Sequence, residues 1–414
     1  MTDSVSGRDR RILRELAGKY REICEKDVQE ERRELWRNHN SLVKTRPPVL
    51  CSWHWGSNAA AELLADEMRC ESELLRPHER WLRNMIFHDT LGDDHVCEPW
   101  IVVRAAVECP EHGRWGVPQE VARDPDGHGW RRMPVLAGIE DVARLVATHH
   151  RVDEEKSRRQ VSLIEDTIGD ILDVAVDRST VYGRWGGTDL SEALGALVGL
   201  EEFMVGLHDD PEFIHRLVSF MRDAVVTNIR ECEEAGDWRL CNGVNMGEPY
   251  ARELPDPSPS PAPAKMKDLW FFTSAQEFTL VSAEQHWDFM MQYQLSIMQE
   301  FGLVAYGCCE DLTTKFDLLR RIPNLRRIGV SPVANVRRCA EQIGRDHVLS
   351  WKPNPAMVVC GSDADYVRKC LAEGLREAGD CNVDIMLKDV TSVGGDRQRL
   401  KQWTQIAREL AEET

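Results

Sequence analysis

The feature that most limits the fold of this chain is a repeated alternation of short apolar runs with longer amphipathic segments. Each run is too short for a helix, and most of the segments between runs have apolar residues at helical spacing. We predict strands at residues 98–104, 170–176, 239–244, 269–274, 303–306, 325–330, 347–351 and 382–387. We predict the main intervening helices at residues 211–235, 286–301, 333–343, 364–378 and 396–412.

Eight strands that alternate with helices predict an α/β fold, a single (β/α)8 TIM-type barrel with an amino-terminal helical cap. An open doubly wound sheet would have fewer strands and usually a glycine-rich phosphate turn, and the sequence contains no GxGxxG or Walker motif. We therefore assign residues 96–414 to the barrel and residues 1–95 to the cap and extension. The cap begins with an amphipathic helix predicted at about residues 9–38.

Two segments of the predicted barrel lack a regular pattern. Residues 111–134 are rich in Gly, Asp and Pro and are expected to form an irregular connection. Residues 255–263 alternate proline with small or acidic residues, which indicates an extended, exposed loop. This loop follows a predicted strand and would lie on the barrel rim, either as a lid or as a spacer.

Composition limits the classes of partner. The chain has a formal net charge of −18, so we expect neither nucleic acid nor an anionic membrane surface to bind it. Its 13 cysteines are odd in number and have no framework spacing, which favours free thiols and a cytoplasmic location. The sequence shows no membrane span. A small-molecule substrate or a protein partner is expected, and a homodimer is left open as the assembly.

The apolar run at residues 303–306 ends in Gly307 followed by Cys308, Cys309, Glu310 and Asp311. A thiolate beside carboxylates at a strand end is a candidate site for a soft or borderline metal such as zinc, held by Cys308 and Glu310. Two packed cysteines at a loop are the alternative interpretation. Because successive strand residues point to opposite faces, we expect only one thiol, Cys308, to face the site.

Other polar residues fall just beyond the predicted strands, where a barrel carries its active site. Pro353 and Pro355 hold Lys352 and Asn354 in a stiff turn that we expect to present both residues to a ligand. Asp177 and Glu248 also lie at strand ends, where a loop polar group or a cap is the more usual role. The candidates for catalysis are Cys308, Glu310, Glu277, Lys352, Lys388 and Asp389, and those for substrate binding are Asn242, Asn245, Gln276, Tyr306, Asn354 and Trp185.

Five short motifs carry a resemblance to a known family. They are Ser274-Ala275-Gln276-Glu277; Tyr306-Gly307-Cys308-Cys309-Glu310; the segment 322–328 with Ser331-Pro332; Trp351-Lys352-Pro353-Asn354-Pro355-Ala356; and Leu387-Lys388-Asp389-Val390. Together they resemble the uroporphyrinogen decarboxylase superfamily, and within it the decarboxylase-like branch related to cobalamin-dependent methyltransferases. The superfamily fold is a single (β/α)8 barrel, in agreement with the strand count.

The resemblance implies methyl transfer between a small methylated substrate and a corrinoid protein, with the cobalamin carried by that partner. Members of this branch hold zinc through a His-x-Cys pair and a later cysteine. Here Cys308 matches the first cysteine, whereas Tyr306 stands at the histidine position and Lys388-Asp389 replaces the last cysteine. These departures leave zinc open.

Two other functions are alternatives to methyl transfer. The arginine-bearing signature by which true uroporphyrinogen decarboxylases grip a polycarboxylate is missing. A decarboxylase or lyase that acts on a smaller organic acid, with Lys352 and Lys388 holding carboxylates, is the first alternative. A non-catalytic ligand-binding barrel is the second.

Overall fold

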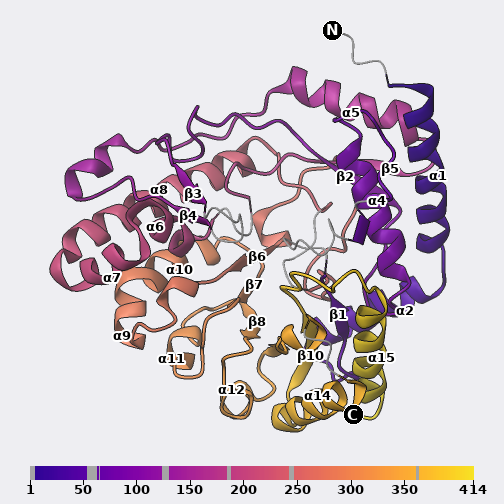
Figure 1. Ribbon diagram of the computed structural model, residues 1–414. Coiled ribbons are helices and arrows are strands. Elements are labelled where there is room, and N and C mark those ends of the chain that lie inside the picture. The colour runs from indigo at the N-terminus through magenta and orange to yellow at the C-terminus, as the bar shows by residue number, and fades with distance from the viewer. Residues whose placement is uncertain are drawn as a thin grey trace.

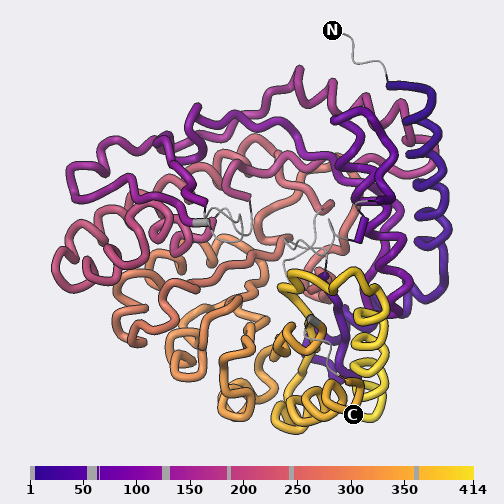
Figure 2. Tube along the Cα trace, in the orientation of Figure 1, coloured from indigo at the N-terminus to yellow at the C-terminus, as the bar shows by residue number. Residues whose placement is uncertain are grey.

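The structure is a computed structural model that describes residues 5–53, 63–64, 66–123, 130–183, 188–241, 247–359 and 363–414. Its centre is a curled parallel sheet with helices packed along its outer face (Figure 1). The yellow carboxyl-terminal helix α15 (Gln398–Glu412) packs beside the indigo-violet β1 (Val49–Cys51), so segments from distant parts of the chain lie next to each other (Figure 2).

The main sheet has six strands in the order β1-β10-β9-β8-β7-β6, and all neighbouring pairs are parallel. Its strands are β1 (Val49–Cys51), β6 (Trp270–Thr273), β7 (Leu303–Tyr306), β8 (Leu325–Val330), β9 (Val348–Trp351) and β10 (Asn382–Leu387). Every residue of β7, β9 and β10 is buried. This burial on both faces explains why β7 is a continuous apolar run and why β9 and β10 are mostly apolar, with polar residues such as Ser350 and Asp384 that have buried partners.

Two further parallel strands, β2 (Trp100–Arg104) and β5 (Asp173–Asp177), pair with each other. Within the described residues they form a separate ladder that is not hydrogen-bonded to β1 or β6. The structure thus shows an α/β half-barrel plus a two-stranded ladder, and the predicted closed eight-stranded barrel is not confirmed.

Seven of the eight predicted strands are present. In the predicted strand at 239–244, residues 239–241 are irregular, and residues 242–244 lie outside the described part of the chain. The eighth parallel strand is β1, which follows Pro48 inside the segment that we had assigned to the cap, and it pairs with β10. Residues 1–95 therefore supply a strand of the main sheet as well as helices.

The helices largely follow the predicted pattern. Five of them begin after an Asp or Asn whose side chain accepts a hydrogen bond from a backbone N–H of the first turn, which offsets the unpaired donors there. The α-helices of the described residues are α1 (Gly7–Cys24), α2 (Val28–Asn40), α4 (Arg76–Asp89), α5 (Glu154–Ile168), α6 (Leu190–Val198), α7 (Leu200–Asp209), α8 (Pro211–Glu234), α9 (Ala283–His286), α10 (Gln292–Met298), α11 (Phe316–Leu319), α12 (Val336–Ile343), α13 (Ala356–Val359), α14 (Ala364–Ala378) and α15 (Gln398–Glu412).

Some segments differ from the prediction. The helix expected at 286–301 is divided, because a π-helical turn, η4 (Trp287–Met291), separates α9 from α10. The segment expected to be irregular contains an antiparallel pair, β3 (Val121–Arg123) with β4 (Trp130–Arg132). The remaining short helices are 3-10 turns, η1 (Ile139–Arg144), η2 (Met266–Asp268) and η3 (Gln276–Phe278). No helix among the described residues is long and apolar enough to cross a membrane.

The interior of the half-barrel contains a charged network. Arg327 on β8 and Asp384 on β10 are 1% and 0% exposed, and Arg327 Nη2 lies 2.8 Å from Asp384 Oδ2. His39 Nε2 lies 3.1 Å from the same carboxylate oxygen, and the Ser350 hydroxyl donates to Asp384 Oδ1 at 2.8 Å. Asn40 accepts from Arg327 Nη1 at 2.8 Å. The network joins α2 to three strands of the sheet.

Candidate functional site

The registers of the main sheet bring the carboxyl ends of its strands to one edge. Thr273 pairs with Tyr306, Val330 with Trp351, and Cys51 with Leu387. The residues that directly follow these strands, among them Ser274, Gly307, Ser331, Lys352 and Lys388, are therefore neighbours at this edge. This placement agrees with the rim predicted from the sequence.

At this edge the chain leaves β7 through Gly307, whose φ of +100° lies in the region that favours glycine. The strand has ended by that point, so the alternation of side chains no longer applies to Cys308 and Cys309. Their Sγ atoms lie 3.7 Å apart, and both face Lys388. The prediction that only one thiol could face the site is therefore wrong, because it assumed that the strand continues.

Lys388 follows β10, and its side chain is almost fully buried. Its Nζ lies 3.3 Å from Cys308 Sγ, 3.0 Å from Cys309 Sγ and 2.6 Å from Asp389 Oδ2. Asp389 has a φ of +59°, an uncommon conformation for a non-glycine residue. We call Cys308, Cys309, Lys388 and Asp389 the thiol site.

The two thiols are electrostatically unequal. A hydrogen bond from Cys308 and a second one from the Lys388 ammonium lower the pKa of Cys309 to about 6, although partial burial opposes this. The same sulfur–sulfur hydrogen bond, together with burial, raises the pKa of Cys308 well above its usual range. Cys309 is also exposed, whereas Cys308 is half-buried against an apolar cluster. These contacts favour ionisation of Cys309 over Cys308, although the Asp389 carboxylate, 3.7 Å from Cys309 Sγ, opposes it.

Glu310 holds the loop that carries the thiols. It is 1% exposed, and its two carboxylate oxygens accept backbone N–H groups, Oε1 from Ala275 at 2.9 Å and Oε2 from Cys308 at 2.8 Å. The Ser331 hydroxyl donates to the Glu310 carbonyl at 3.0 Å. These contacts tie the loop to the residues after β6 and β8, which gives Glu310 a positioning role.

Lys352 holds the same loop through hydrogen bonds to its backbone carbonyls. The sequence predicted a stiff turn that presents Lys352 to a ligand, but Lys352 is 1% exposed, and its Nζ donates to the carbonyls of Gly307 at 2.8 Å and Cys308 at 3.2 Å. A Cβ at Gly329 would lie 2.5 Å from that Nζ and 2.2 Å from the Gly307 carbonyl, so only glycine fits there. Burial lowers the pKa of Lys352. Asn354, by contrast, is exposed, and its side chain accepts from Ala356 N at 2.9 Å.

A group of buried acids lies next to this loop. Asp189 Oδ2 is 2.6 Å from the Ser274 hydroxyl, and Ser191 donates to Glu277 Oε2. Burial raises the pKa of Asp189 to about 8 and also raises the pKa of Glu277. Glu277 was predicted as a site residue from the sequence. Asp189 was not, because it caps α6 and so looks in the sequence like an ordinary helix cap.

This acid gives a pH-dependent prediction. The folded protein keeps Asp189 protonated up to about pH 8, whereas an unfolded aspartate ionises near pH 4. The raised pKa therefore adds stability at low pH that is lost as the pH rises through about 8. Asp189→Asn cannot titrate, so the stability of the natural protein should fall relative to the variant between pH 5 and pH 8. Urea unfolding of both proteins at these two pH values measures it, and a constant difference would contradict it.

The remaining predicted site residues lie apart from the thiol site or cannot be placed. Tyr306 is fully buried, and its hydroxyl contacts His286 Nε2 and Gln294 Oε1, both at 3.1 Å, so it faces α9 and α10. Gln276 is half-buried at the start of η3. Trp185, Asn242 and Asn245 lie outside the described residues.

The residues present do not fit a zinc site. Both Glu310 oxygens accept backbone N–H groups, and the charged partner shared by the two sulfurs is the Lys388 ammonium, which has no lone pair for a metal. Across the described ranges, no group of three or more His, Cys, Asp and Glu side chains is arranged to hold a metal ion. The chemistry of the thiol site is therefore argued from its thiols and its lysine alone.

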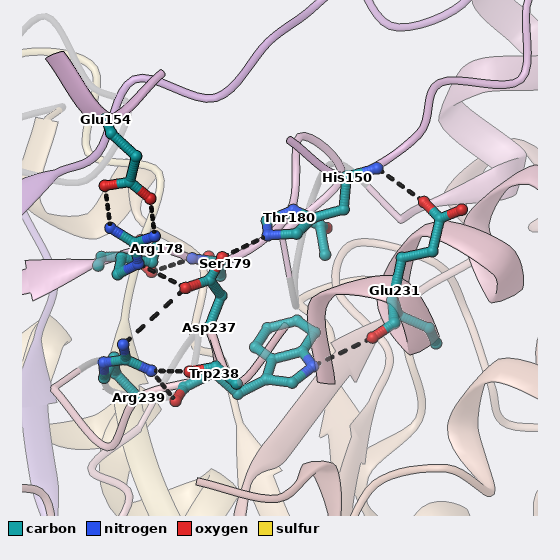
Figure 3. Close-up of polar contacts among 12 residues, drawn as sticks. His150, Glu154, Arg178, Ser179, Thr180, Glu231, Asp237, Trp238 and Arg239 are labelled. Atoms are coloured by element: carbon teal, nitrogen blue, oxygen red, sulfur yellow. Dashed lines mark hydrogen bonds and ion pairs between the residues drawn. The ribbon is translucent and has the colours of Figure 1, made fainter. Parts of the chain in front are cut away.

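The charged side chains of a second polar cluster, around Asp237, form ion pairs with one another (Figure 3). Asp237 contacts Arg178 and His150, and Arg178 also pairs with Glu154 on α5. Asp177, which directly precedes Arg178, pairs with Arg104. Beside this cluster lies a cleft of 760 Å³ that Pro259 and Pro261 of the proline-rich loop help to line. These contacts assign Asp177 and its neighbours a structural role.

The fold and the thiol site together define a class, an α/β half-barrel that carries a lysine-paired dithiol at the carboxyl edge of its parallel strands. No protein-family model matches the chain, and no curated protein matches it. Among solved structures, a methyltransferase from Methanosarcina mazei is similar, with a TM-score of 0.54 at 10% identity over 92% of this chain and 97% of that one. At this identity the likeness shows that the two proteins share a fold and nothing finer.

Proposed function

We propose that this protein is a methyltransferase that uses the Cys309 thiolate as its nucleophile and works with a corrinoid protein as partner. The observation that carries the proposal is the position of Lys388 Nζ, 3.0 Å from Cys309 Sγ at the carboxyl edge of the sheet. A buried cation beside a thiol stabilises the thiolate, which is the reactive form. The methyltransferase-like fold supports the same reaction class.

The proposed step is a displacement. A lone pair of the Cys309 sulfur forms a bond to the methyl carbon of a small methylated substrate, while the bond from carbon to the heteroatom breaks and its electron pair leaves with the heteroatom, which is protonated by water. Lys388 also helps the second displacement, in which the acceptor bonds to the methyl carbon, the carbon–sulfur bond breaks, and the sulfur leaves as a thiolate that the Lys388 ammonium stabilises. A corrinoid on the partner would supply the methyl acceptor.

The alternative of a decarboxylase receives less support from the same geometry. It requires Lys352 and Lys388 to hold substrate carboxylates. Lys352 is buried against two backbone carbonyls, and Lys388 is surrounded by two sulfurs and Asp389. Neither ammonium is directed at open space by these contacts.

The test is an anaerobic assay with reduced free cobalamin and a panel of small methylated substrates. Corrinoid absorbance would follow methyl transfer, and peptide mass would follow methylation of Cys309. We expect Cys309→Ser to reduce transfer to background, because a serine hydroxyl does not ionise near neutral pH. Cys109→Ser, which removes another exposed cysteine, is the matched control and should retain activity.

Two outcomes would count against this function. Release of carbon dioxide from small organic acids without methyl transfer would favour the decarboxylase. Full methyl transfer by Cys309→Ser would show that the thiolate is not the nucleophile.

A further inference from the structure

The two thiols of the site have a chemistry that methyl transfer does not use. We propose that Cys308 and Cys309 form a reversible disulfide with each other in the presence of a low-molecular-weight disulfide, and that this oxidation removes the thiolate from the site. The inference concerns the redox state of the pair and does not depend on the proposed methyl transfer.

The geometry places the two sulfurs for this bond. They lie 3.7 Å apart, against about 2 Å in a disulfide, so the bond would form between two atoms that are already in contact. The residues follow Gly307 in a bent segment that is no longer part of the sheet, so no ladder hydrogen bond keeps the side chains on opposite faces. Cys309 is exposed and can meet a small disulfide, whereas Cys308 is half-buried behind it.

The two cysteines have the unequal roles that disulfide exchange requires. The Cys309 thiolate attacks one sulfur of the small disulfide, so that a mixed disulfide forms and one small thiolate leaves. Cys308 then loses its proton to solvent and attacks the Cys309 sulfur, and the second small thiolate leaves. In total the protein loses two electrons and the one proton of Cys308, and the small disulfide becomes two small thiolates that take up protons from solvent according to their own pKa.

The environment favours this order of attack. Lys388 Nζ lies 3.0 Å from Cys309 Sγ and 3.3 Å from Cys308 Sγ, and this ammonium outweighs the Asp389 carboxylate, 3.7 Å from Cys309 Sγ, which disfavours the thiolate. The more exposed thiol is also the one with the lower pKa. A small disulfide therefore meets the nucleophile first, and the half-buried Cys308 is available to resolve the mixed disulfide.

The bond should also be easy to reduce. Adjacent Cα atoms lie about 3.8 Å apart across a trans peptide, less than the roughly 4.4–6.8 Å usual between disulfide-linked residues. A disulfide in such a small ring is strained, and strained, exposed disulfides are the labile ones. We therefore expect reduced glutathione to restore both thiols, as a switch requires.

The experiment treats the full-length protein with oxidised glutathione, blocks remaining thiols by alkylation, and analyses the peptide that contains residues 308–309. In the natural protein we expect a peptide with neither label nor glutathione, lighter by two hydrogens than the reduced form. In Cys308→Ser we expect glutathione to stay attached to Cys309, because the resolving thiol is missing. Cys109→Ser should behave like the natural protein.

Several results would overturn the proposal. One is a natural protein in which both thiols are still alkylated after treatment, and another is one in which glutathione persists on Cys309. The measurement on the natural protein decides the question even if Cys308→Ser fails to fold. Far-UV circular dichroism checks that folding, and Cys308→Ala provides a second variant.

Discussion

Asp384→Ala should lower the free energy of unfolding by about 3–5 kcal/mol, which is the usual cost of removing one partner of a buried ion pair. The carboxylate of Asp384 is 0% exposed and neutralises Arg327, which is 1% exposed. Without it, the guanidinium stays buried with neutral partners, and both His39 and Ser350 lose a hydrogen-bond acceptor. The loss should appear as a lower midpoint in urea or thermal unfolding.

The matched control is Asp380→Ala, only four residues earlier. Asp380 Oδ2 lies 3.5 Å from Arg345, but their side chains are 85% and 65% exposed. Exposed pairs contribute about 0–1 kcal/mol, so this variant should unfold almost like the natural protein. Similar losses for both variants would show that the interior network does not stabilise the fold as argued.

The strands of the main sheet could be predicted from the sequence because they are buried on both faces. Residues 303–306, 325–330 and 382–387 were assigned with the bounds that the structure has. β1 was missed because three residues after two prolines give almost no pattern, and its pairing with β10 depends on contacts across more than 300 residues of chain. The predicted closure of the barrel is not confirmed, because strand number alone does not determine which edges are hydrogen-bonded.

The buried charges show a different limit. Asp384 lies in the middle of a run that was assigned as an apolar strand, and its charge was the available signal. A carboxylate in a fully buried strand requires a cationic partner, and Arg327 in another strand was the available candidate. The sequence does not show which strands are neighbours, so this pairing became visible only in the fold.

The sequence selected three of the four residues that the structure brings together in the thiol site as catalytic candidates, but the predicted orientation of the two thiols was wrong. The motif at residues 308–310 and Lys388-Asp389 were both selected, and the structure brings Lys388 to the two sulfurs. The relative orientation of the thiols depended on where β7 ends, and strand ends are the least reliable part of such a prediction. Gly307 was the signal, because glycine after a buried run often marks a turn with positive φ.

Lys388→Met should raise the pKa of Cys309 from about 6 toward the usual value of a cysteine. With an ordinary pKa of about 8.5, only a few per cent of the thiol is ionised at pH 7, so alkylation of Cys309 at pH 7 should slow by about 30-fold. In the variant the hydrogen bond from Cys308 still lowers the pKa of Cys309, whereas partial burial and the Asp389 carboxylate still raise it. In the natural protein the rate should rise with pH through about 6 and then level off. In the variant the same rise should occur at higher pH.

The rate is measured as the fraction of the peptide containing residues 308–309 that is alkylated at Cys309 over time, at a series of pH values. Lys369→Met removes an exposed lysine from α14 and is the matched control, with an unchanged profile expected. Unfolding midpoints of both variants separate a local electrostatic effect from a loss of structure. If the pH midpoint of Lys388→Met equals that of the natural protein while the variant remains folded, Lys388 does not activate Cys309. In that case the observation that carries the proposed methyl transfer is lost, whereas disulfide formation between Cys308 and Cys309 can still be tested by itself, because it depends on the distance between the two sulfurs.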